Sequence, residues 1–183
     1  HLIRRETENA KAGKEARIIA KCNSLCDKKI ILALYEASAA GVQIDLIIRG
    51  ICCLIPGVPG LSENIRVRSL VGSFLEHARI FSFYNDGHEE LYMDRRVEIV
   101  FPVEDETLKN KVRHILKLQL ADTIKAHCML PDGNYQKVDK RGKVLLEAQK
   151  EFCKEALSRK QRQPVASRRR FEPGMAPDQE DKE

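Results

Sequence analysis

Two side chains suited to phosphate chemistry stand beside predicted β-strands: Arg49 and His77. Arg49 directly follows the apolar run 42–48, and ligands of open α/β sheets bind beyond the carboxyl ends of such strands. A guanidinium there can hold phosphate oxygens through two parallel hydrogen bonds. The same pattern suits an arginine that pairs with a nearby carboxylate, so an anion site and a structural ion pair both stay open.

His77 lies in the segment Phe74-Leu75-Glu76-His77-Ala78-Arg79, just before another predicted strand. With a carboxylate and a guanidinium close by in sequence, its imidazole can give or take a proton near neutral pH. A packed or solvated histidine is the competing interpretation. The loop 50–60 has neither the Gly-Lys-Ser/Thr ending of a Walker loop nor a dinucleotide fingerprint.

The sequence predicts no metal site. His114 and His127 are expected on one helix, too far apart to share an ion. The six cysteines, which lack the paired Cys-x-x-Cys spacing of a zinc ribbon, are Cys22, Cys26, Cys52, Cys53, Cys128 and Cys153. Cys22, Cys52 and Cys53 lie in or beside apolar runs, so we expect inert core thiols, with an unrecognised metal site as the alternative. Reduced thiols predict a reducing cytoplasm.

The composition indicates one domain with a real core. The chain has 183 residues, of which 43% are hydrophobic, 32% charged and 5% aromatic, too apolar for wholesale disorder. No apolar run approaches the length of a membrane span, and residues 1–8 lack the apolar segment of a secretory signal. Because the sequence begins without methionine, we expect a fragment of a longer cytoplasmic protein, with peripheral attachment to the inner membrane left open.

The charge is unevenly distributed along the chain. Residues 1–136 carry 19 basic and 18 acidic side chains, whereas residues 137–170 carry 12 basic and 4 acidic ones, and an acidic end follows. A basic stretch of this kind can bind a polyanion, RNA or an acidic membrane surface, or can be a solvated helix and tail. Few aromatic residues near this stretch, among them Tyr135 and Phe152, could stack on bases, which disfavours a nucleic-acid-binding module.

Hydrophobic periodicity predicts an α/β fold with a mixed sheet of about five to seven strands flanked by helices. The expected helices are 2–16, 28–40 behind an Asp27 cap, 106–127 and 143–159, and the expected strands are 16–22, 42–48, 65–71, 79–84, 89–93 and 96–102. Strand, helix and strand over 16–48 form a βαβ crossover, which favours a parallel pair. The turn Asn85-Asp86-Gly87 predicts a hairpin.

Three parts of unequal order are expected. Residues 1–138 form the domain, 139–160 a charged C-terminal helix, and 161–183 a disordered tail.

Several sequence strings together are similar to one family. They are Asn9-Ala10-Lys11-Ala12-Gly13-Lys14, Lys21-Cys22-Asn23-Ser24-Leu25, Ala33-Leu34-Tyr35-Glu36-Ala37-Ser38, Asp45-Leu46-Ile47-Ile48-Arg49-Gly50-Ile51-Cys52-Cys53-Leu54, Pro56-Gly57-Val58-Pro59-Gly60-Leu61-Ser62-Glu63-Asn64-Ile65, Phe74-Leu75-Glu76-His77 and Asp94-Arg95-Arg96-Val97-Glu98. This set resembles the C-terminal part of bacterial long-chain polyphosphate kinase, from about Leu2 to Val138. The resemblance implies a phospholipase D-like α/β fold, the last of the family's domains.

The resemblance also implies a reaction and its participants. The family transfers the γ-phosphoryl group of ATP, reversibly, to inorganic polyphosphate through a phosphohistidine, with Mg²⁺ as helper, and forms homo-oligomers. Arg49 matches the family's arginine that contacts nucleotide phosphates, and His77 its second essential histidine, which also lines the nucleotide site and is a candidate proton donor or acceptor. Supporting candidates, for phosphate contacts or for orienting these two, are Lys21, Asn23, Arg66 and Arg79.

Two departures from the family pattern limit what this chain can do. The phosphate-accepting histidine lies in the preceding domain of the family, in a His-Leu-Gly-Thr-Gly-Asn-like segment that this sequence lacks. We therefore expect ATP, polyphosphate and the preceding domains as partners, Mg²⁺ ligands in the preceding domain, and no turnover by this chain alone. Second, Tyr92-Met93 runs directly into Asp94 where the family has a further loop, through a deletion or an unlisted disordered segment. A phospholipase D-like hydrolase would need a His-x-Lys-type motif, which is not found.

Overall fold

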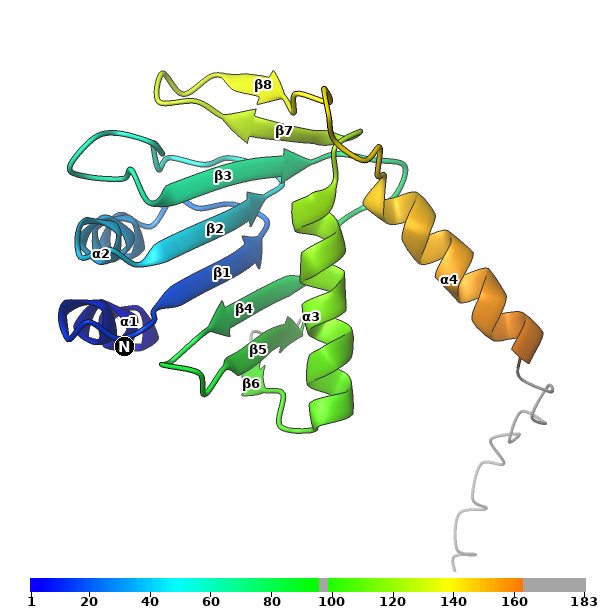
Figure 1. The fold of residues 1–183 in the computed structure, drawn as a ribbon, viewed down its shortest axis with the longest axis horizontal. Helices are drawn as coiled ribbons and strands as arrows, with labels where there is room; N and C mark the ends of the chain where they lie inside the picture. The colour runs from blue at the N-terminus through cyan, green and yellow to red at the C-terminus, as the bar shows by residue number, and fades with distance from the viewer. Residues whose placement is uncertain (96–98, 163–183) are drawn as a thin grey trace, which may run out of the picture.

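The computed structural model describes residues 1–95 and 99–162, which form one mixed β-sheet with helices on both faces (Figure 1). The strand order is β6-β5-β4-β1-β2-β3-β7-β8. The elements are α1 (Leu2–Lys11), β1 (Arg17–Cys22), α2 (Lys28–Ala39), β2 (Gln43–Ile48), β3 (Ile65–Leu70), β4 (Arg79–Phe83), β5 (Glu90–Arg95), β6 (Ile99–Pro102), α3 (Glu106–Ala121), β7 (Ala126–Met129), β8 (Tyr135–Lys137) and α4 (Ala148–Arg162).

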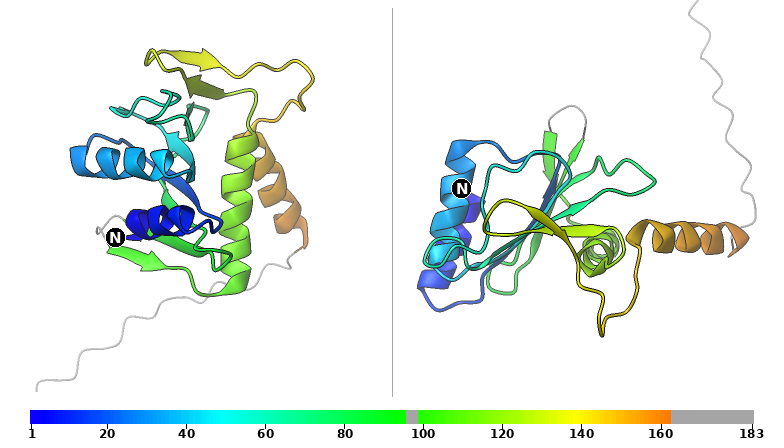
Figure 2. Two further views of the ribbon diagram at one scale, coloured as in Figure 1. Left: turned by 60° about the vertical axis from the view of Figure 1, so that its left-hand side comes forward. Right: turned by 90° about the horizontal axis from the view of Figure 1, so that it is seen from above.

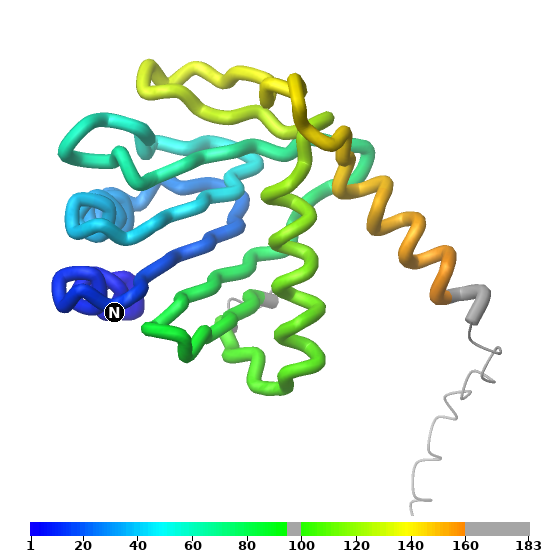
Figure 3. Tube along the Cα trace, in the orientation of Figure 1, coloured from blue at the N-terminus to red at the C-terminus, as the bar shows by residue number. Residues whose placement is uncertain are grey.

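The predicted βαβ crossover forms the centre of the sheet. Strands β1, β2 and β3 run parallel, so their carboxyl ends lie at one edge. Asp27 caps α2 by accepting a hydrogen bond from the Ile30 N–H at 2.9 Å, as an N-cap residue should. Strand β4 pairs antiparallel with β1, and β5 and β6 continue the sheet through further antiparallel pairs. The chain trace enters the loop 71–78 at the edge where β1 and β2 end (Figure 3).

Two hydrophobic clusters occupy the two faces of the sheet. Helices α1 and α2 cover one face and α3 crosses the other (Figure 2). Alternate residues of β2 serve the two clusters: Ile44 and Leu46 pack with Leu34 of α2, whereas Ile47 packs with Leu116 of α3. Each of these side chains is buried, which contributes about 1.5–3 kcal/mol apiece relative to exposure.

Helix α3 is shorter than its apolar periodicity predicts, because Asp122 ends it. The helix stops at Ala121, and the buried Asp122 carboxylate accepts hydrogen bonds from the N–H groups of Ile124, Lys125 and Ala126 at 3.0, 2.7 and 3.1 Å. A local side-chain acceptor of this kind competes with the helical hydrogen bonds. The sequence from 122 to 127 was therefore wrongly assigned to the helix.

The residues after Asp122 form strands that the sequence pattern did not predict. His127 lies in β7, not on the helix of His114, and β7 pairs with β3 on one side and β8 on the other. These two strands raise the count to eight, above the expected range.

The other boundaries differ by a few residues. Helix α1 ends at Lys11 and not at 16, and α4 begins at Ala148, so the segment 139–147 is loop rather than helix. Strand β5 runs through Tyr92, Met93 and Asp94 without interruption. The expected tail beyond residue 162 and the part of the predicted strand at 96–98 lie outside the described residues. Within the described ranges, no helix is long and apolar enough to cross a membrane.

Substitution of Asp122 by alanine should lower the free energy of unfolding by about 2–4 kcal/mol, because four N–H groups lose their acceptor, and those of Ala126 and Ala148 are buried. Urea denaturation followed by circular dichroism measures this loss. Asp139→Ala is the matched control, since Asp139 is exposed and bonds only Arg141. Equal stability of the two variants would contradict the assigned role.

Candidate functional site

Asn23 joins the two loops that carry Arg49 and His77. Its carbonyl oxygen accepts a hydrogen bond from the Gly50 N–H at 2.7 Å, directly after Arg49. Its side-chain nitrogen Nδ2 lies 3.4 Å from Nδ1 of His77. The Arg49 N–H also donates to the Cys22 carbonyl at 3.3 Å. Arg49 and His77 are therefore brought to the same edge of the sheet, one on each side of Asn23.

Gly50 permits this close approach because it has no side chain. A Cβ atom at position 50 would lie 2.9 Å from the Asn23 carbonyl oxygen and 3.1 Å from the Ser24 hydroxyl. Contacts that short require the backbone to shift, so any larger residue would push the loop after β1 away from the loop after β2. This close approach explains why a glycine follows Arg49 in the sequence.

Arg49 has an unsatisfied guanidinium nitrogen. Its Nη1 atom is buried and has no hydrogen-bond partner, and the described residues place no carboxylate within ion-pair distance of the group. The Asn23 Oδ1 atom nearby is buried and unpartnered too. Buried polar atoms of proteins are nearly always hydrogen-bonded, and charged ones are usually paired. Of the two interpretations left open by the sequence, the structural ion pair is not what the described residues show.

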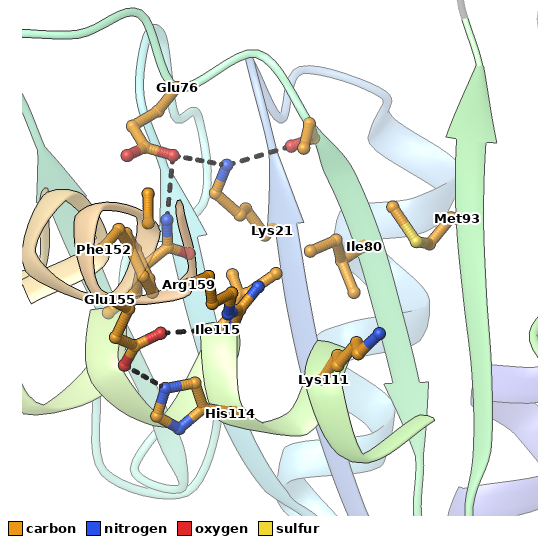
Figure 4. Close-up of a pocket in the computed structure, with 13 residues that line it drawn as sticks. Lys21, Glu76, Ile80, Met93, Lys111, His114, Ile115, Phe152, Glu155 and Arg159 are labelled. Carbon is orange, nitrogen blue, oxygen red and sulfur yellow. Dashed lines mark hydrogen bonds and ion pairs between the residues drawn. The ribbon is translucent and has the colours of Figure 1, made fainter. Parts of the chain in front are cut away.

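Lys21 holds the segment around His77 rather than facing solvent. It is only 3% exposed, and its ammonium group donates to Glu76 Oε2 and to the Ala78 carbonyl, both at 3.1 Å (Figure 4). These partners are the two neighbours of His77 in the chain. Gln119 of α3 donates from Nε2 to Glu76 Oε2 at 2.8 Å. Lys21 therefore supports the His77 segment, and two of its three N–H donors are already used there.

Gln119 was missed by the sequence reasoning, although a signal was present. It stands three residues after Leu116 on the buried stripe of α3 and is 1% exposed. A glutamine on an otherwise apolar helix face needs a polar partner, and that partner is Glu76.

Arg79 lies at the same edge, and Arg66 does not. The Arg79 guanidinium forms an ion pair with Asp94 at 3.5 Å, level with the end of β1. Arg66, which is opposite Asp45 in the β2–β3 register, binds that carboxylate at 2.7 Å. Asp45 precedes Arg49 by four strand residues, about 13 Å. Arg66 is therefore half exposed near the far edge and is not brought together with the other candidates.

A cavity of about 450 Å³ lies behind the His77 segment, between α3, α4 and the sheet (Figure 4). Glu76 and Ala78 contribute to its wall, but Arg49 and His77 do not. Its far side is held by a hydrogen bond between His114 Nε2 and Glu155 Oε1 at 2.6 Å. The candidate site itself is the partly exposed edge in front of this cavity.

The cysteines are less buried than expected. Cys22 and Cys52 are half buried, whereas Cys53 is exposed, so the prediction of a buried Cys53 was wrong. Burial raises the pKa of the Cys22 thiol to about 11 and raises that of Cys52. Leu25 and Cys52 form a single parallel β-bridge, and the residue that follows, Cys53, is exposed. The described residues contain no group of three or more acidic, histidine or cysteine side chains that could hold a metal.

The carboxylates at this edge do not fit a magnesium site. Glu76 is fully engaged with Lys21 and two side-chain amides, and Asp94 Oδ2 is paired with Arg79. Of these two carboxylates, only Asp94 Oδ1 has no partner among the described residues, and one buried oxygen does not make a metal site. Mg²⁺ prefers free carboxylate or phosphate oxygens in an octahedral arrangement. No step at this edge is therefore derived through a metal ion.

Ion pairs partly neutralise the basic stretch where it is described. Within α4, Lys150, Lys154 and Arg159 pair with Glu147, Glu151 and Glu155. In the preceding loop, Arg141 binds Asp139. Ion pairs within the stretch reduce the local positive field that a nucleic-acid-binding surface needs.

Comparison with known proteins identifies relatives over most of the chain. The family model "Polyphosphate kinase C-terminal domain 2" matches residues 1–149. The chain is 51% identical over 158 residues to a polyphosphate kinase of Burkholderia ambifaria, covering 80% of this chain and 23% of that protein. It is 46% identical over 177 residues to polyphosphate kinase 1 of Chlorobaculum tepidum, covering 91% and 25%. The chain thus spans about a quarter of the length of these relatives.

A solved structure supports the same assignment. The crystal structure of polyphosphate kinase from Porphyromonas gingivalis superposes with a TM-score of 0.80 at 39% identity, covering 88% of this chain and 26% of that one. The expected phospholipase D-like α/β class is confirmed. The alignment with the Burkholderia protein has 158 positions although it covers 80% of a 183-residue chain, so some positions of that relative have no counterpart here.

Asp45 should make stability depend on pH in the acid range. Burial raises its pKa, but hydrogen bonds from Arg66 and Arg17 outweigh burial, and the net pKa lies below the ordinary 3.8. The unfolded chain therefore binds the proton more readily, and stability is lost as the pH falls from the ordinary value through the folded-state pKa. Urea titrations at a series of pH values should show this loss in the unmodified protein and a smaller loss in Asp45→Asn. The exposed Glu63→Gln is the control, and an unchanged pH profile in Asp45→Asn would contradict the assignment.

Proposed function

The chain belongs to the family of polyphosphate kinase C-terminal domain 2, and from this premise we propose that it supplies the phosphate-binding half of a polyphosphate kinase active site. The complete enzyme transfers the γ-phosphoryl group of ATP to inorganic polyphosphate, and the transfer is reversible. The phosphate-accepting histidine belongs to the preceding domain, so this chain binds and orients phosphates but does not turn over alone. The enzyme is a cytoplasmic homo-oligomer, and its Mg²⁺ ligands also belong to the preceding domain.

The observation that carries this proposal is the buried, unpartnered Nη1 of Arg49. A guanidinium that keeps its charge and has an unused donor is prepared for an anion, and a phosphate oxygen accepts hydrogen bonds from it in a fixed geometry. Phosphoryl transfer requires mainly positioning and cancellation of negative charge on the transferred group. The Arg49 guanidinium supplies the positive charge. It is also well positioned, because hydrogen bonds to the Cys22 and Asn23 carbonyls fix the backbone at Arg49 and Gly50.

His77 contributes a proton whose position on the ring is set by Asn23. The Asn23 amide nitrogen can only donate, so Nδ1 of the neutral imidazole accepts, and the proton sits on Nε2. That N–H is then available to a phosphate oxygen, and a second proton on Nδ1 would break the contact with Asn23. His77 thus acts as donor to the phosphates, or as proton donor and acceptor during the transfer.

The remaining candidates have supporting roles in this proposal. Lys21 fixes the residues on both sides of His77, and Asn23 orients its ring. Arg79, which is held by Asp94 at the same edge, adds positive charge near the phosphates. Arg66 takes no part, because it binds Asp45 toward the other end of the sheet.

Replacement of Arg49 or His77 by alanine should lower the rate of polyphosphate synthesis by about 10²–10³-fold, the usual loss when one donor to a transition-state charge is removed. The measurement uses the complete enzyme with ATP and Mg²⁺, and product is followed as polyphosphate chain length. Arg66→Ala is the matched control, because it removes an arginine from the same sheet outside the site.

The same experiment can contradict the proposal. If Arg49→Ala and His77→Ala turn over like Arg66→Ala, the phosphates bind elsewhere. This chain by itself, mixed with ATP and Mg²⁺, should form no phosphohistidine. Stable phosphorylation of His77 would show that the acceptor histidine lies in this chain and not in the preceding domain.

A further inference from the structure

Gln149, the second residue of α4, grips the loop that carries His77. Its Oε1 accepts a hydrogen bond from the Phe74 N–H at 3.0 Å, and its Nε2 donates to the Phe74 carbonyl at 2.8 Å. The same Nε2 donates to Glu76 Oε1 at 3.0 Å. The side-chain amide therefore satisfies both backbone groups of one loop residue and the carboxylate two residues later. It does so while 9% exposed, where such bonds are not exchanged easily for water.

The Gln149 amide occupies the space that a side chain at Gly72 would fill. A Cβ atom at position 72 would lie 2.2 Å from Oε1 of Gln149. A side chain at position 72 would displace the Gln149 amide, because real Cβ contacts are never that short. The loop and the helix are thus fitted to each other at Gly72 and Gln149.

Asp122 holds the start of α4, and with it Gln149, against the rest of the domain. The Asp122 carboxylate ends α3 and also accepts the N–H of Ala148, the residue before Gln149, at 2.8 Å. The first turn of α4 is therefore tied to the end of α3, whereas the helix extends outward beyond that turn (Figures 1 and 2). The contacts of α4 with the loop come from Gln149 in its first turn.

Polar contacts are the principal anchors of this loop. Its apolar side chains Val71, Phe74 and Leu75 are 65%, 61% and 74% exposed, so they contribute little burial that could hold it. Glu76 is instead held by Lys21, Gln119 and Gln149, one residue each from β1, α3 and α4. Loss of the contact from Gln149 leaves Glu76 Oε1 without its partner.

We propose that Gln149 is a positioning residue for His77. By fixing Phe74 and Glu76 it holds the imidazole against Asn23, so that Nδ1 accepts and Nε2 carries the proton. The C-terminal helix, expected from sequence as a separate charged appendage, is in this way part of the site. The consequence for catalysis rests on the proposed function, but the effect on the His77 ring does not.

The test uses NMR of this chain with Gln149→Ala, Gln149→Glu and, as control on the same helix, Lys154→Ala, whose residue pairs only with Glu151 on the surface. Imidazole nitrogen chemical shifts report which nitrogen of His77 carries the proton, and hydrogen exchange reports the Phe74 N–H. Gln149→Ala should speed exchange at Phe74 by about tenfold or more, the worth of one net hydrogen bond. Both Gln149 variants should shift His77 toward a mixture of tautomers, because both remove the donor to the Phe74 carbonyl and to Glu76. Lys154→Ala should match the unmodified chain.

Gln149→Glu separates positioning from packing because it keeps the size of the side chain. At neutral pH its carboxylate replaces the donor Nε2 and faces the Phe74 carbonyl and the Glu76 carboxylate, so it should disturb the ring at least as much as alanine does. In the complete enzyme it should lower kcat more than it raises KM and displace the pH profile of the rate.

The outcomes distinguish this inference from the proposed function. If both Gln149 variants retain folded-state circular dichroism and leave the His77 nitrogen shifts and the Phe74 exchange rate unchanged, Gln149 does not position His77, whatever Arg49→Ala does to activity. If the ring responds as stated but Arg49→Ala and His77→Ala keep full activity, the positioning role stands and the proposed function is wrong. A Gln149→Glu enzyme with unchanged kcat and pH profile would also overturn the catalytic consequence.

Discussion

The hydrogen bond from the Gly50 N–H to the Asn23 carbonyl determines the geometry of the candidate site. It brings the loop after β2, which carries Arg49, against the loop after β1, whose Asn23 side chain reaches His77. The contact is possible only because position 50 is glycine. A permanent cation and a histidine ring thereby meet at one sheet edge, where Nη1 of Arg49 and Oδ1 of Asn23 are still unpartnered within the described part of the chain. This is the arrangement expected where an anion completes the hydrogen bonding.

Behind that edge, hydrogen bonds between buried polar side chains hold the chain in place, whereas apolar packing does so elsewhere in the domain. Lys21, Glu76, Gln119 and Gln149 form a connected set whose members come from four segments of the chain, and Asp122 fixes the helix ends that contribute to it. A buried polar network in a low-dielectric interior is sensitive to the exact placement of each member. It suits a loop that must present a histidine at a defined angle while leaving its own apolar residues exposed.

The local signals in the sequence predicted the centre of the fold correctly. The Asp27 cap, the βαβ order and the placement of Arg49 directly after a buried strand all follow from short-range patterns, and the structure confirms them. The end of α3 was missed because a continuous apolar period masks a competing acceptor, Asp122, whose partners are set by tertiary contacts. Arg66 looked like Arg79 in sequence, and only the strand register shows that its partner, Asp45, lies toward the opposite edge.

Binding of inorganic tripolyphosphate to this chain, followed by NMR of the arginine and histidine side chains, tests the central claim most directly. The account predicts that the largest chemical-shift changes fall on the Arg49 guanidinium and the His77 ring, and that Arg49→Ala removes them. Changes confined to the lysines and arginines of residues 137–159, surviving Arg49→Ala and disappearing with modest salt, would show that the anion is held by the basic stretch and not at the strand ends.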